Sequence, residues 1–196
     1  MYNIYMYTKY DNYTSTSGLS TKMWGPSGWY FLFSCIMGGY PPQINEKDKH
    51  HLVIKKHFKN LILSLAYTMP CIFCRESFKK FCEELPIENS MGSRMDLMKW
   101  LYNIRDKVNK KLISQEKQCY NNEKLRLKKM YYSRPPTKQR KEMYYKKLEE
   151  FKEKTLVTQS SPPFKDVLEK YESIRAVCSK QSKTCSLPTK KKSLQF

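Results

Sequence analysis

The sequence contains no apolar run of the roughly 20 residues that a membrane-spanning helix needs. Its first 18 residues are rich in Tyr, Asn, Thr and Ser. They lack the charged start followed by an apolar run that is typical of a secretory signal. These two absences predict a soluble chain that is cytoplasmic and not secreted.

A framework of closely spaced cysteine pairs is also missing. The chain has 7 cysteines, an odd number, and they are scattered except for Cys71 and Cys74. A stapled extracellular domain would need paired cysteines at short spacings, so that class is a poor explanation. Redox chemistry or metal binding fits the cysteines better.

Alternating strand patterns are absent as well, and the apolar residues follow helical spacings instead. One apolar helix is predicted over Trp24–Met37, and a second is capped by Asn45 and ends before Met69. A third begins at Cys71, and a fourth is capped by Ser93 and extends to about residue 114. Four helices with short connections predict an all-α helical bundle.

The charge is distributed unevenly along the chain. Of 196 residues, 37 are Lys or Arg and 18 are Asp or Glu, which gives a net charge of +19. A field of this size attracts phosphate, anionic membranes or acidic proteins, so charge alone does not choose a partner. We expect a flexible arm over 1–20, a bundle domain over 21–120, and a basic extension over 121–196 that is partly helical and disordered after Ser179.

The Cys71-x-x-Cys74 motif gives its two thiols different roles if a helix starts at Cys71. The positive end of the helix dipole, with Arg75 nearby, favours a thiolate at Cys71, which would exchange with incoming thiols. Cys74, one turn further in, would resolve the mixed disulfide and pass electrons to a cofactor.

Structural zinc is the alternative use of this spacing, and it requires two more ligands. The candidates form no second CxxC or H-x₃-H pair, so no metal site is predicted from Cys82, Cys119, Cys178, Cys185, His50, His51 and His57. A thioredoxin-like fold would need strands. Redox chemistry on an all-helical scaffold is the better interpretation.

Three segments resemble the Erv/Alr family of FAD-linked sulfhydryl oxidases. Trp24–Phe33 resembles the family's W-G-x-x-x-W-x-x-L-H helix, and Tyr40-Pro41 follows it as in the family. Pro70–Arg75 resembles the P-C-x-x-C motif, and Trp100–Leu112 resembles the W-x₄-H-N-x-V-N-x-x-L helix. The chain also resembles short members of the family from large DNA viruses.

The resemblance implies a four- or five-helix bundle that binds FAD. It implies oxidation of protein dithiols through Cys71 and Cys74, with molecular oxygen as acceptor and hydrogen peroxide as product. Phe33 and Arg105 replace the family's histidines; Phe33 would act as a flat apolar wall, and Arg105 would contact adenine or phosphate. The implied FAD contacts are Trp29, Phe33, Tyr40, Cys74, Trp100, Arg105, Val108 and Asn109.

The resemblance also implies a shuttle pair of cysteines and a homodimer. Cys178 and Cys185, with six residues between them, are the candidates for the shuttle, and the alternative is two unpaired thiols. The homodimer would form through the faces of the first two helices.

The basic extension allows two interpretations. Its lysines and arginines alternate with tyrosines, as on surfaces that bind single-stranded nucleic acid. A solvated helical appendage is the other interpretation. The alternative function for the whole chain is a non-catalytic basic adaptor for nucleic acid or protein that has lost FAD.

Overall fold

The structure is a computed structural model that describes residues 19–132, 134–178 and 185–186. The predicted flexible arm and the predicted disorder after Ser179 fall almost entirely outside these residues. The elements are α1 (Thr21–Gly39), α2 (Lys49–Thr68), α3 (Ile72–Glu84), the 3₁₀ helix η2 (Ile87–Ser90), α4 (Arg94–Tyr132), α5 (Lys138–Thr155), α6 (Phe164–Ser173), β1 (Val177–Cys178) and β2 (Cys185–Ser186).

The all-α prediction is confirmed, with one addition. The described residues form helices almost throughout, and β1 and β2 make a two-residue antiparallel ladder. No helix among the described residues is both long enough and apolar enough to cross a bilayer.

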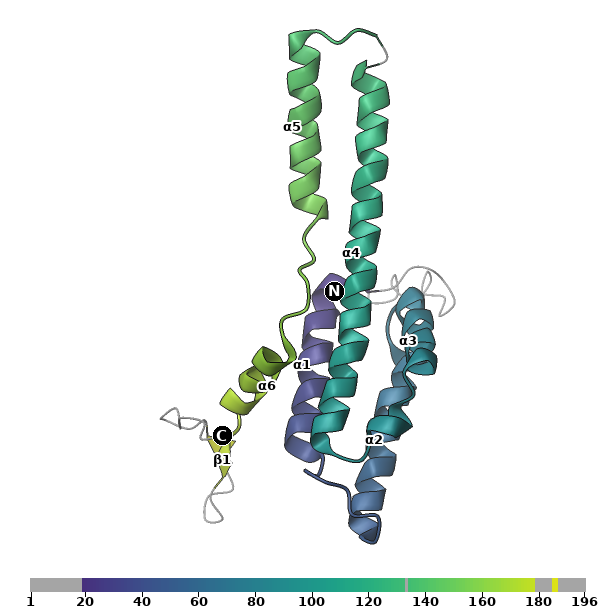
Figure 1. The fold of residues 1–196 in the computed structure, drawn as a ribbon, viewed down its shortest axis with the longest axis vertical. Helices are drawn as coiled ribbons and strands as arrows, with labels where there is room; N and C mark the ends of the chain where they lie inside the picture. Colours follow the sequence, from purple (N-terminus) through teal and green to yellow (C-terminus); the bar gives the residue numbers. More distant parts are fainter. Residues whose placement is uncertain (1–18, 133, 179–184, 187–196) are drawn as a thin grey trace, which may run out of the picture. The chain divides into compact units, whose positions relative to one another are not determined.

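The chain divides into two compact units. Unit 1 contains residues 1–104 and 162–196, and unit 2 contains residues 105–161. Unit 1 therefore includes α1, α2, α3, the start of α4 and α6 (Figure 1). The boundary expected near residue 120 stays a prediction, since the units divide at other positions.

One hydrophobic cluster joins the helices of unit 1. Tyr40 follows α1 and is fully buried, and its hydroxyl donates to the carbonyl oxygen of Met91 at 2.7 Å. The Tyr40 ring also meets Phe58 of α2 edge to face, with centroids 5.1 Å apart. The cluster's buried members are Leu32, Phe33, Ile36, Met37, Tyr40, Ile62, Phe78, Ile87, Met91, Leu97, Met98, Trp100, Leu101, Ile104, Val167 and Tyr171.

Helix starts confirm two of the sequence predictions and correct one. Ser93 Oγ accepts from the backbone N–H of Asp96 at 3.0 Å, so Ser93 caps α4 as expected. Cys71 is the N-cap residue of α3, also as expected. Asn45 does not cap α2, because its side chain accepts from Lys47 N and closes a local turn; Asp48 is the cap.

Helix α4 continues 18 residues beyond the end predicted near residue 114. The change in composition there alters the charge of the helix but introduces no glycine or proline between Arg94 and Tyr132. The helix ends shortly before Pro135 and Pro136, where proline removes the donor that a helix needs.

Unit 2 is a hairpin made by the distal part of α4 and by α5 (Figure 1). Its small core contains Leu127, Tyr144 and Leu148. Near the open end of the hairpin, the carboxylate of Glu116 accepts from Thr158 N at 3.0 Å and from Thr158 Oγ1 at 2.6 Å. The prediction that the basic extension is partly helical is therefore confirmed.

Helix α6 packs against α1 inside unit 1. The Tyr171 ring stacks on Phe33 with centroids 5.2 Å apart and an interplanar angle of 24°. Tyr171 also contacts Tyr30, with centroids 5.8 Å apart. The residues after Pro162 thus belong to the same core as the first helix.

Candidate functional site

The CxxC motif lies at the start of α3. The carbonyl oxygen of Cys71 accepts from the backbone N–H groups of Cys74 and Arg75, each at 3.1 Å, so Cys74 lies one turn into the helix. Both cysteines are free thiols and half-buried. The positive end of the helix dipole therefore lies beside Cys71, where it stabilises negative charge.

The segment before Cys71 is held from two sides. Arg75 Nη1 donates to the carbonyl oxygen of Met69 at 2.7 Å. The backbone N–H of Leu19 donates to the carbonyl oxygen of Pro70 at 3.1 Å, and Trp24 Nε1 of α1 donates to Leu19 O at 3.2 Å. These bonds fix the entry to α3, and with it the position of the first thiol.

Five of the predicted cofactor contacts lie in unit 1, and three of them are core residues with protein partners. Phe33 is 0% exposed and stacks on Tyr171. Tyr40 donates to Met91 as described, and Trp100 Nε1 donates to Leu85 O at 2.8 Å. The other two, Trp29 and Cys74, are half-buried. Contact of these residues with FAD stays a prediction.

The other three predicted contacts lie in unit 2 and are half-buried. Asn109 Nδ2 donates to Ser161 Oγ at 3.0 Å. Its neighbour Asp106 is bonded by Lys110 Nζ at 2.7 Å and by Ser161, and these bonds hold the pKa of the Asp106 carboxyl below its usual range. Asn109 is thus oriented by a side-chain network of the hairpin, and Arg105 and Val108 stay predicted contacts.

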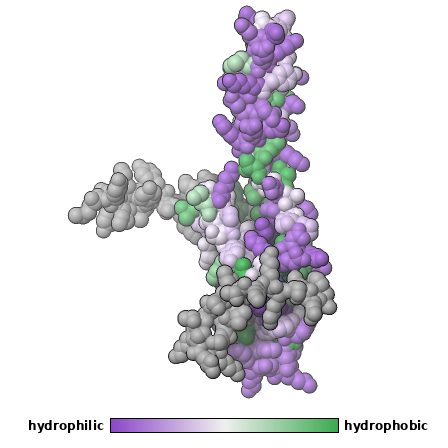
Figure 2. Space-filling model, turned by 90° about the vertical axis from the view of Figure 1, so that its left-hand side faces the viewer, coloured by the Kyte–Doolittle hydropathy of each residue, from purple (hydrophilic) through white to green (hydrophobic). Residues whose placement is uncertain are grey.

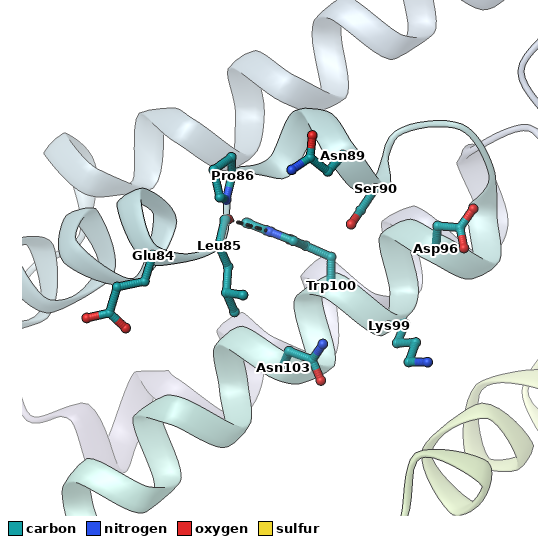
Figure 3. A pocket seen from close by; sticks show the side chains of 9 residues that line it. All are labelled: Glu84, Leu85, Pro86, Asn89, Ser90, Asp96, Lys99, Trp100 and Asn103. Atoms are coloured by element: carbon teal, nitrogen blue, oxygen red, sulfur yellow. Dashed lines mark hydrogen bonds between the residues drawn. The ribbon is translucent and has the colours of Figure 1, made fainter.

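One pocket lies between the end of α3 and the start of α4, with a volume of about 320 Å³ (Figure 3). The indole of Trp100 forms part of its wall, with its hydrogen bond to Leu85 visible in the figure. No cysteine contributes to the lining, which consists of Glu84, Leu85, Pro86, Asn89, Ser90, Asp96, Lys99, Trp100 and Asn103. This pocket is therefore separate from the dithiol.

Two further thiols have environments that disfavour the thiolate. Burial raises the pKa of Cys82 to about 11, and Glu88 and Glu83 add to the effect. Burial also raises the pKa of Cys35. Both are poor nucleophiles near neutral pH, whereas Cys119 is exposed on α4.

The two cysteines predicted as a shuttle pair are direct partners in the β ladder. Cys178 of β1 is opposite Cys185 of β2 in the antiparallel register. The sequence spacing alone left this pairing open. Among the described residues, no three His, Cys, Asp or Glu side chains are placed to hold a metal ion.

Comparisons with known proteins place the chain in a family. The Erv1/Alr family model matches residues 26–133, a range that includes Cys71 and Cys74. The mitochondrial FAD-linked sulfhydryl oxidase ERV1 of Saccharomyces cerevisiae is 31% identical over 95 residues, covering 48% of this chain and 46% of that protein. The chain thus spans about half the length of this curated relative.

A solved structure, the crystal structure of the yeast Erv1 core, matches with 27% identity and a TM-score of 0.41. The match covers 52% of this chain and 78% of the solved chain. Since the family model spans more than half of the sequence and contains the helical CxxC site, the chain belongs to the Erv1/Alr family.

Proposed function

We propose that this chain is an FAD-dependent sulfhydryl oxidase that forms disulfides in protein dithiols, with molecular oxygen as acceptor and hydrogen peroxide as product. The observation that carries the proposal is the position of Cys71 at the N-cap of α3, with Cys74 one turn later. The family match over the same residues supports it.

The thiol exchange assigns each sulfur a role. With the motif as a disulfide, a substrate thiolate attacks Cys71 Sγ; the substrate–Cys71 bond forms, the Cys71–Cys74 bond breaks, and Cys74 leaves as a thiolate. The second substrate thiolate then attacks the substrate sulfur of this mixed disulfide, and Cys71 leaves. The substrate loses two electrons and the motif gains them.

This balance changes one role expected from the sequence. In the oxidising direction the second substrate thiol resolves the mixed disulfide, and Cys74 is the leaving group. Cys74 acts as the resolving thiol only in the reverse direction, when the reduced motif attacks a disulfide.

Residues of unit 1 have the chemistry to hold a flavin dinucleotide. Ser34 Oγ on α1 is buried and has no hydrogen-bond partner among the described residues. Such an unpaired hydroxyl costs about 1–3 kcal/mol, which a polar group of a ligand would offset. Trp29 on the same helix leaves part of its indole accessible, and Cys74 supplies the sulfur. FAD, when bound, supplies two-electron acceptance and reaction with oxygen, which side chains lack.

The first test is the visible absorption spectrum of the purified protein, before and after addition of FAD and removal of excess. We expect a flavin band near about 450 nm. With dithiothreitol as substrate, oxygen uptake should equal peroxide formation. A protein that stays colourless after FAD is added would contradict the proposal and favour the basic adaptor.

We further propose that Cys178 and Cys185 form the shuttle pair. Partners in an antiparallel ladder have Cα atoms about 4.5 or 5.5 Å apart, which is within the usual range for a disulfide. The register of β1 and β2 therefore supports a disulfide that accepts electrons from a protein substrate and passes them to Cys71.

The shuttle predicts a difference between large and small substrates. The double variant Cys178→Ser/Cys185→Ser should oxidise a reduced protein at least about tenfold more slowly, because a tethered relay acts at high effective concentration. Oxidation of dithiothreitol, which reaches Cys71 directly, should be unchanged. Initial rates of oxygen uptake measure both, with Cys119→Ser as the matched control. Equal rates with the protein substrate would exclude the shuttle.

A homodimer through α1 and α2 is also part of the proposal. Large apolar side chains are exposed on these two helices, which is unusual for a surface that faces only water. They are Tyr30, Phe31, Leu52, Val53, Leu61 and Tyr67. Sedimentation equilibrium of the purified chain measures the oligomeric state directly.

A further inference from the structure

The turn end of the hairpin in unit 2 is densely cationic. We call residues 124–132 and 134–147 the basic tip. It contains 10 Lys or Arg residues and a single acidic residue, Glu142. Hydrophilic side chains cover most of the hairpin on the face shown in Figure 2.

Most of these cations are exposed and unneutralised. Within the described part of the chain, eight of the ten have no acidic partner: Lys124, Lys128, Lys129, Arg134, Lys138, Lys141, Lys146 and Lys147. Outside the tip, the hairpin lysines Lys110 and Lys152 are paired with Asp106 at 2.7 Å and Glu149 at 2.8 Å. The positive potential is therefore concentrated at the turn end.

An aromatic pair lies among these cations. The hydroxyls of Tyr132 on α4 and Tyr145 on α5 are hydrogen-bonded to each other. The Tyr145 ring also meets Tyr144, which is buried in the hairpin core, with centroids 5.1 Å apart. Tyr145 is nevertheless 63% exposed. Its ring is thus held in place by neighbours and remains accessible from solvent.

The helical spacing places lysines on both sides of this pair. Lys128 precedes Tyr132 by four residues on α4, and Lys141 precedes Tyr145 by four residues on α5. Residues four apart lie on the same face of a helix. An anionic chain crossing the hairpin would therefore meet a cation, an aromatic ring and a second cation in succession.

A bilayer surface fits the tip less well. A helix that lies on a membrane presents an apolar face outward, but the apolar residues Leu127, Tyr144 and Leu148 are buried between α4 and α5. The exposed Leu125 and Met130 are five residues apart and so lie on different faces of α4. No apolar stripe on α4 accompanies the charge.

We propose that the basic tip binds single-stranded nucleic acid, with its lysines on the phosphates and Tyr145 stacked on an unpaired base. Alternation of cations with an accessible, rigidly held ring is the arrangement that binds single strands without sequence preference. This activity is independent of the thiol chemistry.

The test is the affinity of the full chain for a fluorescent 20-nucleotide single strand, DNA or RNA, measured by anisotropy at 50–200 mM salt. If about four phosphates are neutralised, log affinity should fall with log salt with a slope of roughly −3. Lys128→Glu/Lys141→Glu should weaken binding at least about tenfold at the lower salt concentration and reduce the slope by about 1 per lysine lost.

A matched control separates a local site from the field of the whole protein. Lys49 and Lys56 of α2 are exposed and, in the described structure, have no ion pair. Lys49→Glu/Lys56→Glu changes the net charge by the same amount outside the hairpin, and its affinity should stay within about twofold of the unmodified chain. Equal weakening by both double variants would overturn the proposal.

Tyr145 tests the stacking contact. Tyr145→Ala should weaken single-strand binding by about tenfold, whereas Tyr145→Phe, which keeps the ring, should bind as the unmodified chain does. Circular dichroism would check that the hairpin stays helical. A blunt duplex should be bound more weakly and be insensitive to Tyr145→Ala. Duplex binding that depends on Tyr145, or preferential binding to vesicles with anionic lipid, would contradict the assignment.

Discussion

Cys71→Ser is expected to reduce dithiol oxidation by roughly 10³-fold or more, because no other sulfur in the described structure has its position at the start of a helix. Cys74→Ser should lose turnover to the same extent, since a lone Cys71 has no disulfide to exchange. Oxygen uptake with dithiothreitol measures both. The absorption band of the flavin should persist in both variants, which separates lost exchange from lost cofactor.

The two variants should differ when the reaction is run backward. With oxidised glutathione, the Cys71 thiolate of Cys74→Ser should form a mixed disulfide that nothing resolves, whereas the unmodified motif should release glutathione and close its own disulfide. Peptide mapping by mass spectrometry would locate the adduct at Cys71. Cys74 in Cys71→Ser should react more slowly, because it lies one turn inside the helix.

The background of this experiment follows from the other thiols. Cys119 is exposed, so the trap is made in a Cys119→Ser chain. Cys35 and Cys82 have raised pKa values and should stay unmodified near neutral pH. An adduct on Cys74 rather than Cys71, or full turnover in either single variant, would show that the assigned roles are wrong.

Leu101→Ala should lower the free energy of unfolding by about 3–5 kcal/mol, the loss seen when a fully buried leucine leaves a cavity. Leu101 is 0% exposed at the centre of the unit 1 cluster. Urea unfolding followed by far-UV circular dichroism measures the change, with the flavin concentration held constant, because a bound ligand adds its own stabilisation.

The same helix provides the control for this substitution. Leu125 is also on α4 but is 59% exposed, so Leu125→Ala should change the free energy of unfolding by less than about 0.5 kcal/mol. Similar losses for the two variants would mean that the cluster around Leu101 is less tightly packed than the structure indicates.

The sequence predicted the interior of α4 better than its ends. Apolar spacing placed Leu97, Leu101 and Ile104 on one face, and all three are buried. The same spacing placed Met95 and Leu112 on that face, but both are exposed. Periodicity identifies a face; it does not show how far neighbouring helices cover it.

The dithiol was located from sequence because its determinants are local. Pro70 prevents α2 from continuing, and the helix that follows begins at Cys71, as the motif indicated. The cofactor contacts depend on tertiary packing. Tyr40 and Trp100 were assigned to FAD by resemblance, and the structure gives their polar atoms protein partners as well.

The return of α6 to the bundle was missed. Val167, Leu168, Tyr171 and Ile174 follow a helical spacing, a signal that the sequence did contain. Periodicity could not reveal that this face packs on α1, because the contact between Phe33 and Tyr171 joins residues 138 positions apart.

That contact sets an order of events during synthesis of the chain. A ribosome adding about 5–20 residues per second needs roughly 7–28 s to travel from Phe33 to Tyr171. Throughout this interval the four earlier helices can meet, but the ring of Phe33 lacks the residue that covers it. The nascent bundle therefore displays an uncovered aromatic surface until the hairpin has emerged and α6 arrives, and this interval is when a chaperone that recognises apolar surface would act on it.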